Sequence, residues 1–302
     1  MLNPSLRRAL VAGAATLGLL GASSAAVACS TCKCGDYTIN LFGAEKPFEQ
    51  RFRVGADLLI RSETQGDPAV NVRETEETRL LLGLAYSLNE DVTVALQLPF
   101  VRKTLEDNTL ARQEAEGFGD ADLVARWVLY RQGAVSGRHL AGVRAGVRLP
   151  TGEQVRDSSG ARLDIDVQPD AGAWAPNLGA WYGYYRFPWN LNATVTWLQF
   201  GDGRQGFDPG NALVASVHGQ YGVTQTVALQ AGLDARYAQR NRFSGVVDAD
   251  SGGTLAMVFA GAAVRVLNEL ILNAGVQLPL LDRLNGEQEE DPVVRLGFAY
   301  DL

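Results

Sequence analysis

Apolar and polar side chains alternate over most of the sequence after residue 51. The first alternating segment carries its apolar residues at Phe52, Val54, Ala56, Leu58 and Ile60. The positions between them include Arg53, Asp57 and Arg61. Successive side chains of an extended chain point to opposite faces, so this period of two predicts a strand with one apolar and one polar face.

Further segments repeat this pattern to the end of the chain. After the first, at 51–61, they lie at 79–88, 92–100, 120–130, 139–150, 172–186, 190–200, 211–221, 226–240, 254–266, 270–280 and 292–302. The segment at 254–266 is the least regular, because Met257 and Phe259 share a phase with Arg265. These segments make about twelve strands, with a range of about 10–14. Twelve is an even number, which closure of an antiparallel barrel favours.

The connections between these segments alternate in length. The long ones are polar and lie at 62–76, 104–117, 151–170, 201–210, 241–253 and 281–291. The short ones lie at 89–90, 131–138, 187–189, 222–225 and 267–269. Outer-membrane β-barrels have short periplasmic turns and longer extracellular loops. The rhythm therefore predicts the orientation, with residues 29–50 and Leu302 on the periplasmic side.

The last segment ends on its apolar face. Val294, Leu296, Phe298, Tyr300 and Leu302 share that face. This ending is similar to the C-terminal assembly signal of outer-membrane barrels, although the usual last residue there is aromatic. A soluble β-sandwich would also have alternating strands, but the loop rhythm and this ending count against it. We therefore predict an all-β fold, an antiparallel transmembrane β-barrel over residues 51–302, located in the bacterial outer membrane.

The amino terminus predicts export. Arg7 and Arg8 precede an apolar run from Ala9 to Leu20, and Ala26-Val27-Ala28 has the small-x-small pattern of a cleavage site. Together these features indicate a secretory signal peptide over residues 1–28. The apolar run is shorter than the roughly 20 residues that a membrane-spanning helix needs. The 302-residue chain carries a net charge of −7, which argues against a nucleic-acid partner.

Charged residues recur on the polar phase of the predicted strands. A charge that faced lipid at mid-depth would cost roughly 2–4 kcal/mol, so these side chains should face the lumen. The predicted lumen-lining residues are Arg53, Asp57, Arg79, Asp120, Asp122, Arg126, Arg144, Arg148, His218, Asp234 and Arg236. Two interpretations stay open: the residues select solutes along a path, or they only solvate the lumen and pair with one another.

Several short motifs carry a resemblance to a known family. They are Gly117–Leu123 followed by Arg126 and Tyr130, Leu98-Pro99-Phe100, Leu149-Pro150-Thr151-Gly152, and the Tyr300-Asp301-Leu302 ending. With these motifs the sequence resembles outer-membrane proteins of the "MetA-pathway of phenol degradation" family, also called simply transporters, over most of residues 51–302. The resemblance implies a β-barrel that moves small, often aromatic, compounds across the outer membrane. It brings no catalytic residues.

All three cysteines lie within residues 29–34, as Cys29, Cys32 and Cys34. Three thiolates so close together could bind a soft metal, copper(I) above all. Cys29 directly follows the predicted cleavage site and is also a candidate for lipidation. Alternatively, Cys32 and Cys34 form a disulfide with each other or with a partner. The segment 36–50 that follows is expected to be a tether, or a plug that enters the lumen from the periplasm.

Acidic residues gather in the predicted outer loops. They are Glu74, Glu76, Glu77, Glu106, Glu114, Glu116, Asp157, Asp164, Asp166, Glu287, Glu289, Glu290 and Asp291. Their oxygen atoms suit calcium or magnesium, and the simpler interpretation is a set of solvated loops that engage lipopolysaccharide through bridging cations.

The sequence predicts a channel or transporter for small solutes, with aromatic or hydrophobic compounds as candidates, and no enzymatic activity or cofactor. Its partners would be outer-membrane lipid, lipopolysaccharide, the barrel-assembly machinery and the solute. A copper-handling or redox-associated accessory protein is the alternative, based on the cysteines. A hydrolase is the third, because Ser216, His218 and Asp234 fall on neighbouring polar faces and could supply a nucleophile, a base and an acid.

Overall fold

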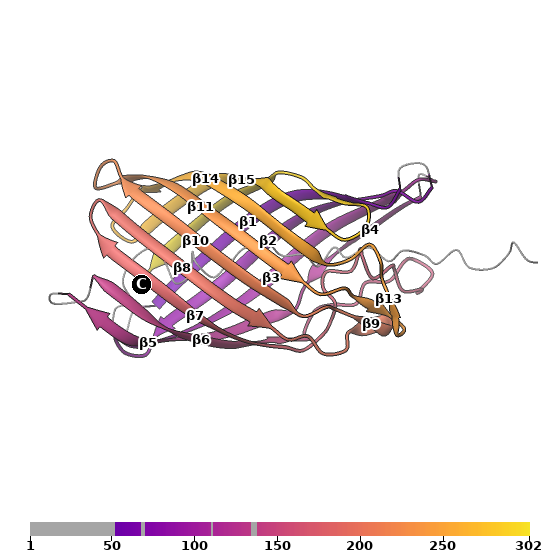
Figure 1. Ribbon diagram of the computed structural model, residues 1–302, viewed down its shortest axis with the longest axis horizontal. Coiled ribbons are helices and arrows are strands. Elements are labelled where there is room, and N and C mark those ends of the chain that lie inside the picture. The colour runs from indigo at the N-terminus through magenta and orange to yellow at the C-terminus, as the bar shows by residue number, and fades with distance from the viewer. Residues whose placement is uncertain (1–51, 68–69, 110, 134–137) are drawn as a thin grey trace, which may run out of the picture.

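The computed structural model describes residues 52–67, 70–109, 111–133 and 138–302. Twelve antiparallel strands form a closed barrel in chain order (Figure 1). They are β1 (Phe52–Gln65), β2 (Arg73–Ser87), β3 (Val92–Asp107), β5 (Ala121–Gln132), β6 (His139–Leu149), β7 (Ala175–Arg186), β8 (Trp189–Leu198), β10 (Ala212–Gly222), β11 (Val227–Ala238), β14 (Gly253–Arg265), β15 (Leu270–Leu284) and β17 (Val293–Asp301). Strand β1 pairs with both β2 and β17, which closes the barrel and confirms the predicted fold.

The two faces of the barrel wall differ in chemistry. Along β2, Leu82, Leu84 and Tyr86 are exposed on the outside, whereas Arg79 and Leu81 on the other phase are buried inside. Other strands repeat this pattern, with Leu123 and Trp127 of β5 among the exposed apolar residues. Closure satisfies the backbone hydrogen bonds within the wall, and the apolar exterior then suits lipid.

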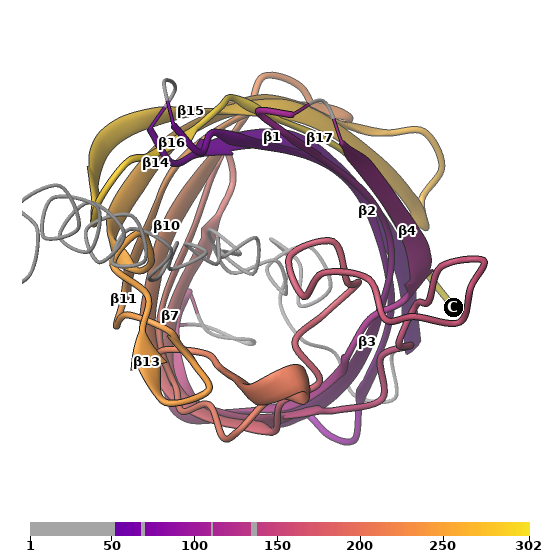
Figure 2. The same cartoon turned by 90° about the vertical axis from the view of Figure 1, so that its right-hand side faces the viewer.

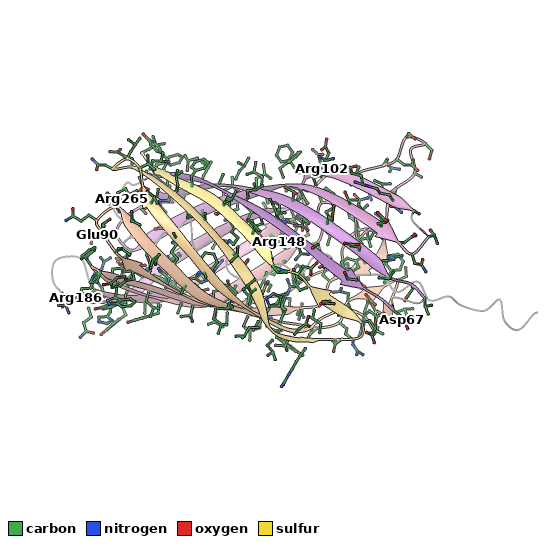
Figure 3. The ribbon with its side chains drawn as sticks, turned by 90° about the horizontal axis from the view of Figure 1, so that it is seen from above. Asp67, Glu90, Arg102, Arg148, Arg186 and Arg265 are labelled. Atoms are coloured by element: carbon green, nitrogen blue, oxygen red, sulfur yellow. The ribbon has the colours of Figure 1, made fainter. Side chains whose placement is uncertain are left out.

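Aromatic residues gather on the outer face toward each end of the wall. Trp189 and Tyr221 pack with ring centroids 4.7 Å apart at the short-turn end. Phe100 and Phe118 form an edge-to-face pair at 5.3 Å nearer the loop end. Such girdles mark the two membrane interfaces of outer-membrane barrels. Glu90 and Arg186 lie beyond the first interface and Asp67 beyond the second (Figure 3).

Three of the predicted long loops are strands over much of their length, so the prediction of loops at 62–76, 104–117 and 281–291 was wrong there. Strands β1 and β2 stay paired up to Gln65 and Arg73. β3 continues to Asp107 and pairs with β4 (Arg112–Phe118), and β16 (Gln288–Glu290) pairs with β1. The outward side chains in these extensions are charged, as in the exposed ion pair of Arg102 with Glu114. The pairing therefore continues past the apolar band into water.

The connection between β6 and β7 takes a different course. From Pro150 to Ala173 it folds into the ring of strands at the loop end (Figure 2). Its residues Ile165, Ala171 and Ala173 are buried there with Phe207, which begins β9 (Phe207–Asp208) after the short helix η1 (Arg204–Gly206). Strands β12 (Arg242–Phe243) and β13 (Val246–Val247) join β9 in a separate small sheet. The loop end of the barrel is thus partly filled by its own loops.

The predicted signal peptide (1–28) and the cysteine segment (29–50) lie outside the described residues. In the described part of the chain, no helix is long and apolar enough to cross a membrane.

Candidate functional site in the barrel lumen

Ion pairs join neighbouring strands on the inner face of the wall. The Arg148 guanidinium on β6 donates two hydrogen bonds, each 3.0 Å, to the Asp122 carboxylate on β5. Arg53 on β1 donates to Asp301 on β17 at 2.6 and 2.8 Å. Charge-assisted pairs with two parallel bonds are among the stronger hydrogen bonds in proteins. They fix these side chains against the wall of the barrel.

Arg126 packs against aromatic residues. Its guanidinium lies 3.5 Å from the ring centroid of Trp181, and it donates a 3.3 Å hydrogen bond to the Tyr185 hydroxyl. That hydroxyl in turn donates to the Asn192 amide oxygen at 3.0 Å. Val128 and Leu140 are buried beside the two aromatic residues. The inner face is therefore amphipathic here, since a cation, two aromatic rings and aliphatic side chains lie side by side.

The remaining predicted wall residues also lie on the inner face and are buried. Arg144 is in register with Arg126 on the neighbouring strand. Asp57 lies over Gly297 of β17, where a Cβ atom would come within 2.2 Å of the Asp57 carboxylate. Arg236 lies near the loop end, beside Glu290 and Gln65. The structure places these residues in the lumen, and a role in solute selection stays a prediction.

A dense charge network occupies the outer half of the lumen. Arg61 lies 2.9 Å from Glu63, 3.8 Å from Glu77 and 3.3 Å from Glu290. Glu77 also accepts a 2.5 Å bond from Arg79 and lies 3.7 Å from Lys103. The expectation of solvated loop carboxylates was therefore wrong for Glu77 and Glu290. Both fall on the inward phase of extended strands, where buried carboxylates require cationic partners.

The inserted loop is tied to this network. Lys103 donates to the Asp166 backbone carbonyl at 3.3 Å, and Arg73 lies 3.1 Å from the Asp166 carboxylate. Arg79 lies 3.6 Å from the Asp170 carboxylate. Asp166 is thus a third acidic residue that the sequence placed in solvent and the structure buries. Among the residues that the structure describes, no group of three or more metal-ligating side chains forms a candidate metal site.

Asp120 holds the two ends of the inserted loop. Its carboxylate accepts hydrogen bonds from the backbone N–H of Gly152 at 2.9 Å and of Gly172 at 3.0 Å. Its own N–H donates to the Asp170 carboxylate at 3.0 Å. The Gly117–Leu123 motif is the break between β4 and β5, and its bend turns the Asp120 carboxylate toward the loop. The lumen-lining role predicted for Asp120 is therefore an anchoring role in the structure.

By contrast, the tip of the same loop is exposed. There Asp157 accepts bonds from the Ser159 hydroxyl and from the N–H of Ala161. The hydrogen bond from the Ser159 hydroxyl, together with bonds from backbone N–H groups such as that of Ala161, holds the pKa of Asp157 below its usual value.

His218 and Asp234 meet in the lumen, as the sequence allowed. The imidazole Nε2 lies 3.0 Å from one Asp234 oxygen, and Gln277 donates to the other at 2.6 Å. Ser216 also bonds to the Asp234 carboxylate. A hydrolytic triad would need the serine hydroxyl on the imidazole. Here the serine and the histidine share the acid, so the described contacts form a polar brace between β10, β11 and β15.

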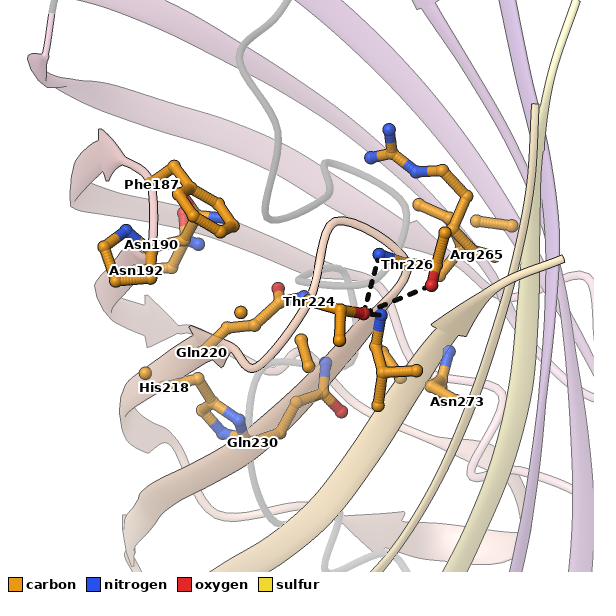
Figure 4. A pocket seen from close by; sticks show the side chains of 18 of the residues that line it. Phe187, Asn190, Asn192, His218, Gln220, Thr224, Thr226, Gln230, Arg265 and Asn273 are labelled. Atoms are coloured by element: carbon orange, nitrogen blue, oxygen red, sulfur yellow. Dashed lines mark hydrogen bonds between the residues drawn. The ribbon is translucent and has the colours of Figure 1, made fainter. Parts of the chain in front are cut away.

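A cavity of about 200 Å³ opens at the short-turn end of the lumen (Figure 4). Its wall includes Asn192, His218, Gln230 and Asn273, together with the Phe259 ring and the Arg295 side chain. Phe187 and Pro188 of the β7–β8 turn and residues 224–226 of the β10–β11 turn lie at its rim. Of its lining residues, the polar phase of the predicted strands places Arg53, His218 and Arg295 in the lumen, whereas Phe259, in the least regular segment, was not predicted there.

The cysteines Cys29, Cys32 and Cys34 lie outside the described residues. Copper binding, a disulfide and lipidation of Cys29 therefore stay predictions.

No protein-family model matches the sequence, and no curated protein matches it. Among solved structures, the chain is similar to an outer membrane channel from Pseudomonas putida F1, with 16% identity and a TM-score of 0.64 over 85% of this chain and 97% of the other. It is similar to the β domain of a Bordetella autotransporter, with 11% identity and a TM-score of 0.51 over 84% and 100%. A toluene transporter of P. putida gives 10% identity and a TM-score of 0.48 over 86% and 91%. The first two similarities show that the chain has the fold of an outer-membrane β-barrel.

Proposed function

We propose that this protein is an outer-membrane channel for small solutes that combine an aromatic or other apolar part with a polar group. The observation that carries the solute class is the mixed chemistry of the lumen. Leu255, Met257 and Val293 form a buried apolar cluster on the inner face of the outer half, with Leu59 beside them. Trp181 and Tyr185 line the inner face nearer the periplasm. Water-filled porins have polar interiors, so apolar patches at both levels favour amphipathic solutes.

The likeness to the P. putida outer membrane channel supports the fold, and the sequence motifs supply the finer proposal. The resemblance to the phenol-degradation family points to aromatic compounds as substrates. The cavity is of a suitable size, because an apolar protein cavity of about 150 Å³ is known to hold benzene. On this proposal, a solute passes the loop-filled outer mouth and reaches the cavity before release into the periplasm.

Uptake by intact cells tests this function. A Gram-negative host without general porins keeps an intact lipopolysaccharide barrier, so entry of labelled benzyl alcohol should increase when the full chain is expressed and folded. A matched host would express the variant Arg131→Gln, which alters an exposed ion pair with Asp91 outside the lumen, and should take up the label equally. Uptake no faster than in cells without the protein would contradict the proposal.

A further inference from the structure

Arg295 is an unusual member of the lumen wall. The residue is only 6% exposed and lines the cavity. Within the described part of the chain, its guanidinium makes no hydrogen bond and no ion pair within 4 Å. Its contacts there are the Phe259 ring, 5.8 Å away, and a longer-range electrostatic interaction with Asp234. Asp234 is already bonded to His218 and Gln277. The guanidinium opens to the cavity, so this arginine is available to an anionic ligand.

Phe259 lies beside this cation as a flat apolar surface. Its ring lies against the wall over Gly275, where a Cβ atom would come within 2.4 Å of the ring. The His218 ring lies beside it, with ring centroids 5.3 Å apart and ring planes tilted by 37°. His218 in turn covers Gly232, where a Cβ atom would come within 2.7 Å of the imidazole. Glycine at these two positions lets both rings lie close to the strands, which leaves space in the lumen for a ligand.

The charge of the cavity wall has one sign. Arg53, Arg265 and Arg295 line it, and no aspartate or glutamate is among the lining residues that the structure describes. The carboxylates of Asp57, Asp234 and Asp301 lie nearby, and none of the three is without a partner, since Asp301 is bonded to Arg53 and Asp234 to His218. Neutral amides of Asn192 and Asn273 add donors and acceptors to the wall. An anion therefore meets cations and amides without facing an unpaired negative charge.

From these observations we infer that the cavity binds a single-ring aromatic carboxylate. The carboxylate accepts hydrogen bonds from the Arg295 guanidinium, which presents the fork geometry that suits it. The ring packs on Phe259, and the volume of about 200 Å³ accommodates one ring with a short substituent. The inference rests on the proposed function, because it assigns a charged substrate class to the periplasmic end of the proposed channel.

Calorimetric titration of the full chain in lipid nanodiscs tests this site with three probes. Benzoate has both the ring and the charge, acetate has only the charge, and benzyl alcohol has only the ring. We expect benzoate to bind more tightly than either. Arg295→Gln should weaken benzoate binding by about tenfold or more, since it removes charge-assisted hydrogen bonds. Arg295→Lys should be intermediate, because lysine keeps the charge and loses the fork.

Two further variants separate the ring contact from general damage. Phe259→Leu should weaken benzoate binding and leave the weak response to acetate unchanged. Arg131→Gln, at the same end of the barrel but outside the cavity, should bind benzoate like the unmodified chain. Each variant is first checked for the heat-dependent gel shift of a folded barrel. If Arg295→Gln shifts normally yet binds benzoate with unchanged affinity, or if benzyl alcohol binds as tightly as benzoate, the inference is overturned.

Conductance of the same preparations distinguishes failure of this site from failure of the channel. If the chain conducts ions but does not bind benzoate, the inferred binding site is refuted and the proposed channel function stands. If the chain binds benzoate through Arg295 but neither conducts ions nor passes solute, the inferred site stands and the proposed channel function is refuted.

Discussion

Asp122 and Arg148 stand directly opposite each other on β5 and β6, so the carboxylate and the guanidinium meet with two hydrogen bonds. Both residues are more than nine-tenths buried. The pair shows how residue chemistry shapes the lumen, because each charge is balanced across the strand boundary and neither is left to a passing solute. In such a site the loss of one partner costs more than the loss of both.

Removing one member of this pair should therefore destabilise the barrel. We expect Arg148→Gln or Asp122→Asn alone to lower the free energy of unfolding by about 3 kcal/mol. The double variant should lose less than the sum of the single losses, because no uncompensated charge remains. Urea unfolding in lipid vesicles measures all four proteins of the cycle. Strictly additive losses would mean that the pair contributes no coupling.

At the residue scale, the sequence could predict that the charged side chains point inward, because lipid excludes charge. It could not predict which residues these side chains bond to. Asp120 and Asp122 share a phase, yet one anchors a loop and the other pairs with an arginine. The difference arises from the break between β4 and β5 and from the register of β6. Likewise nothing in a period of two shows that Arg295 has no hydrogen-bonded partner among the described residues, since that depends on every neighbouring strand.

Among the elements, the long connections departed most from expectation. Glu77 belongs to a polar, acidic stretch that resembles a loop, yet it lies on the inward phase of an extended strand. Period-two alternation of polar residues on both faces gives no apolar signal, so strands that continue into water are hard to recognise. The inserted loop between β6 and β7 escaped prediction for a related reason. Its burial depends on Asp120 and Arg79, which are distant in sequence.

Asp120→Ala should release this inserted loop while the barrel stays folded. The substitution leaves the N–H groups of Gly152 and Gly172 without their acceptor, and each lost bond to a charged group is worth roughly 1.5–3 kcal/mol. We expect faster proteolysis within 151–173 on the purified protein, followed by mass spectrometry of the fragments. The control Asp157→Ala changes the exposed tip of the same loop and should not speed cleavage at 163–173. Equal cleavage in both variants would mean that Asp120 does not anchor the loop.

For the whole molecule, closure of the barrel explains both the apolar outer face of the wall and the polar inner face. β1 pairs with β17 from Arg53–Asp301 to Ile60–Val294, so the first and last strands complete one continuous wall. Lipid selects the apolar phase outside, and the opposite phase then carries the charges and rings of the lumen. This architecture could be predicted well from sequence, because most of the twelve strands follow one period and the connections between them alternate in length. The same alternating pattern could not predict that loops and side chains fill part of the lumen.

The most direct test of the proposed channel is current through a planar lipid bilayer that contains the folded full-length protein. The account predicts discrete current steps from the unmodified chain, small because loops and paired side chains narrow the lumen. Asp120→Ala should give larger steps, since the outer mouth is then less filled. Absence of current steps from both proteins, with the gel shift of a folded barrel in each preparation, would contradict the claim that this barrel passes solutes.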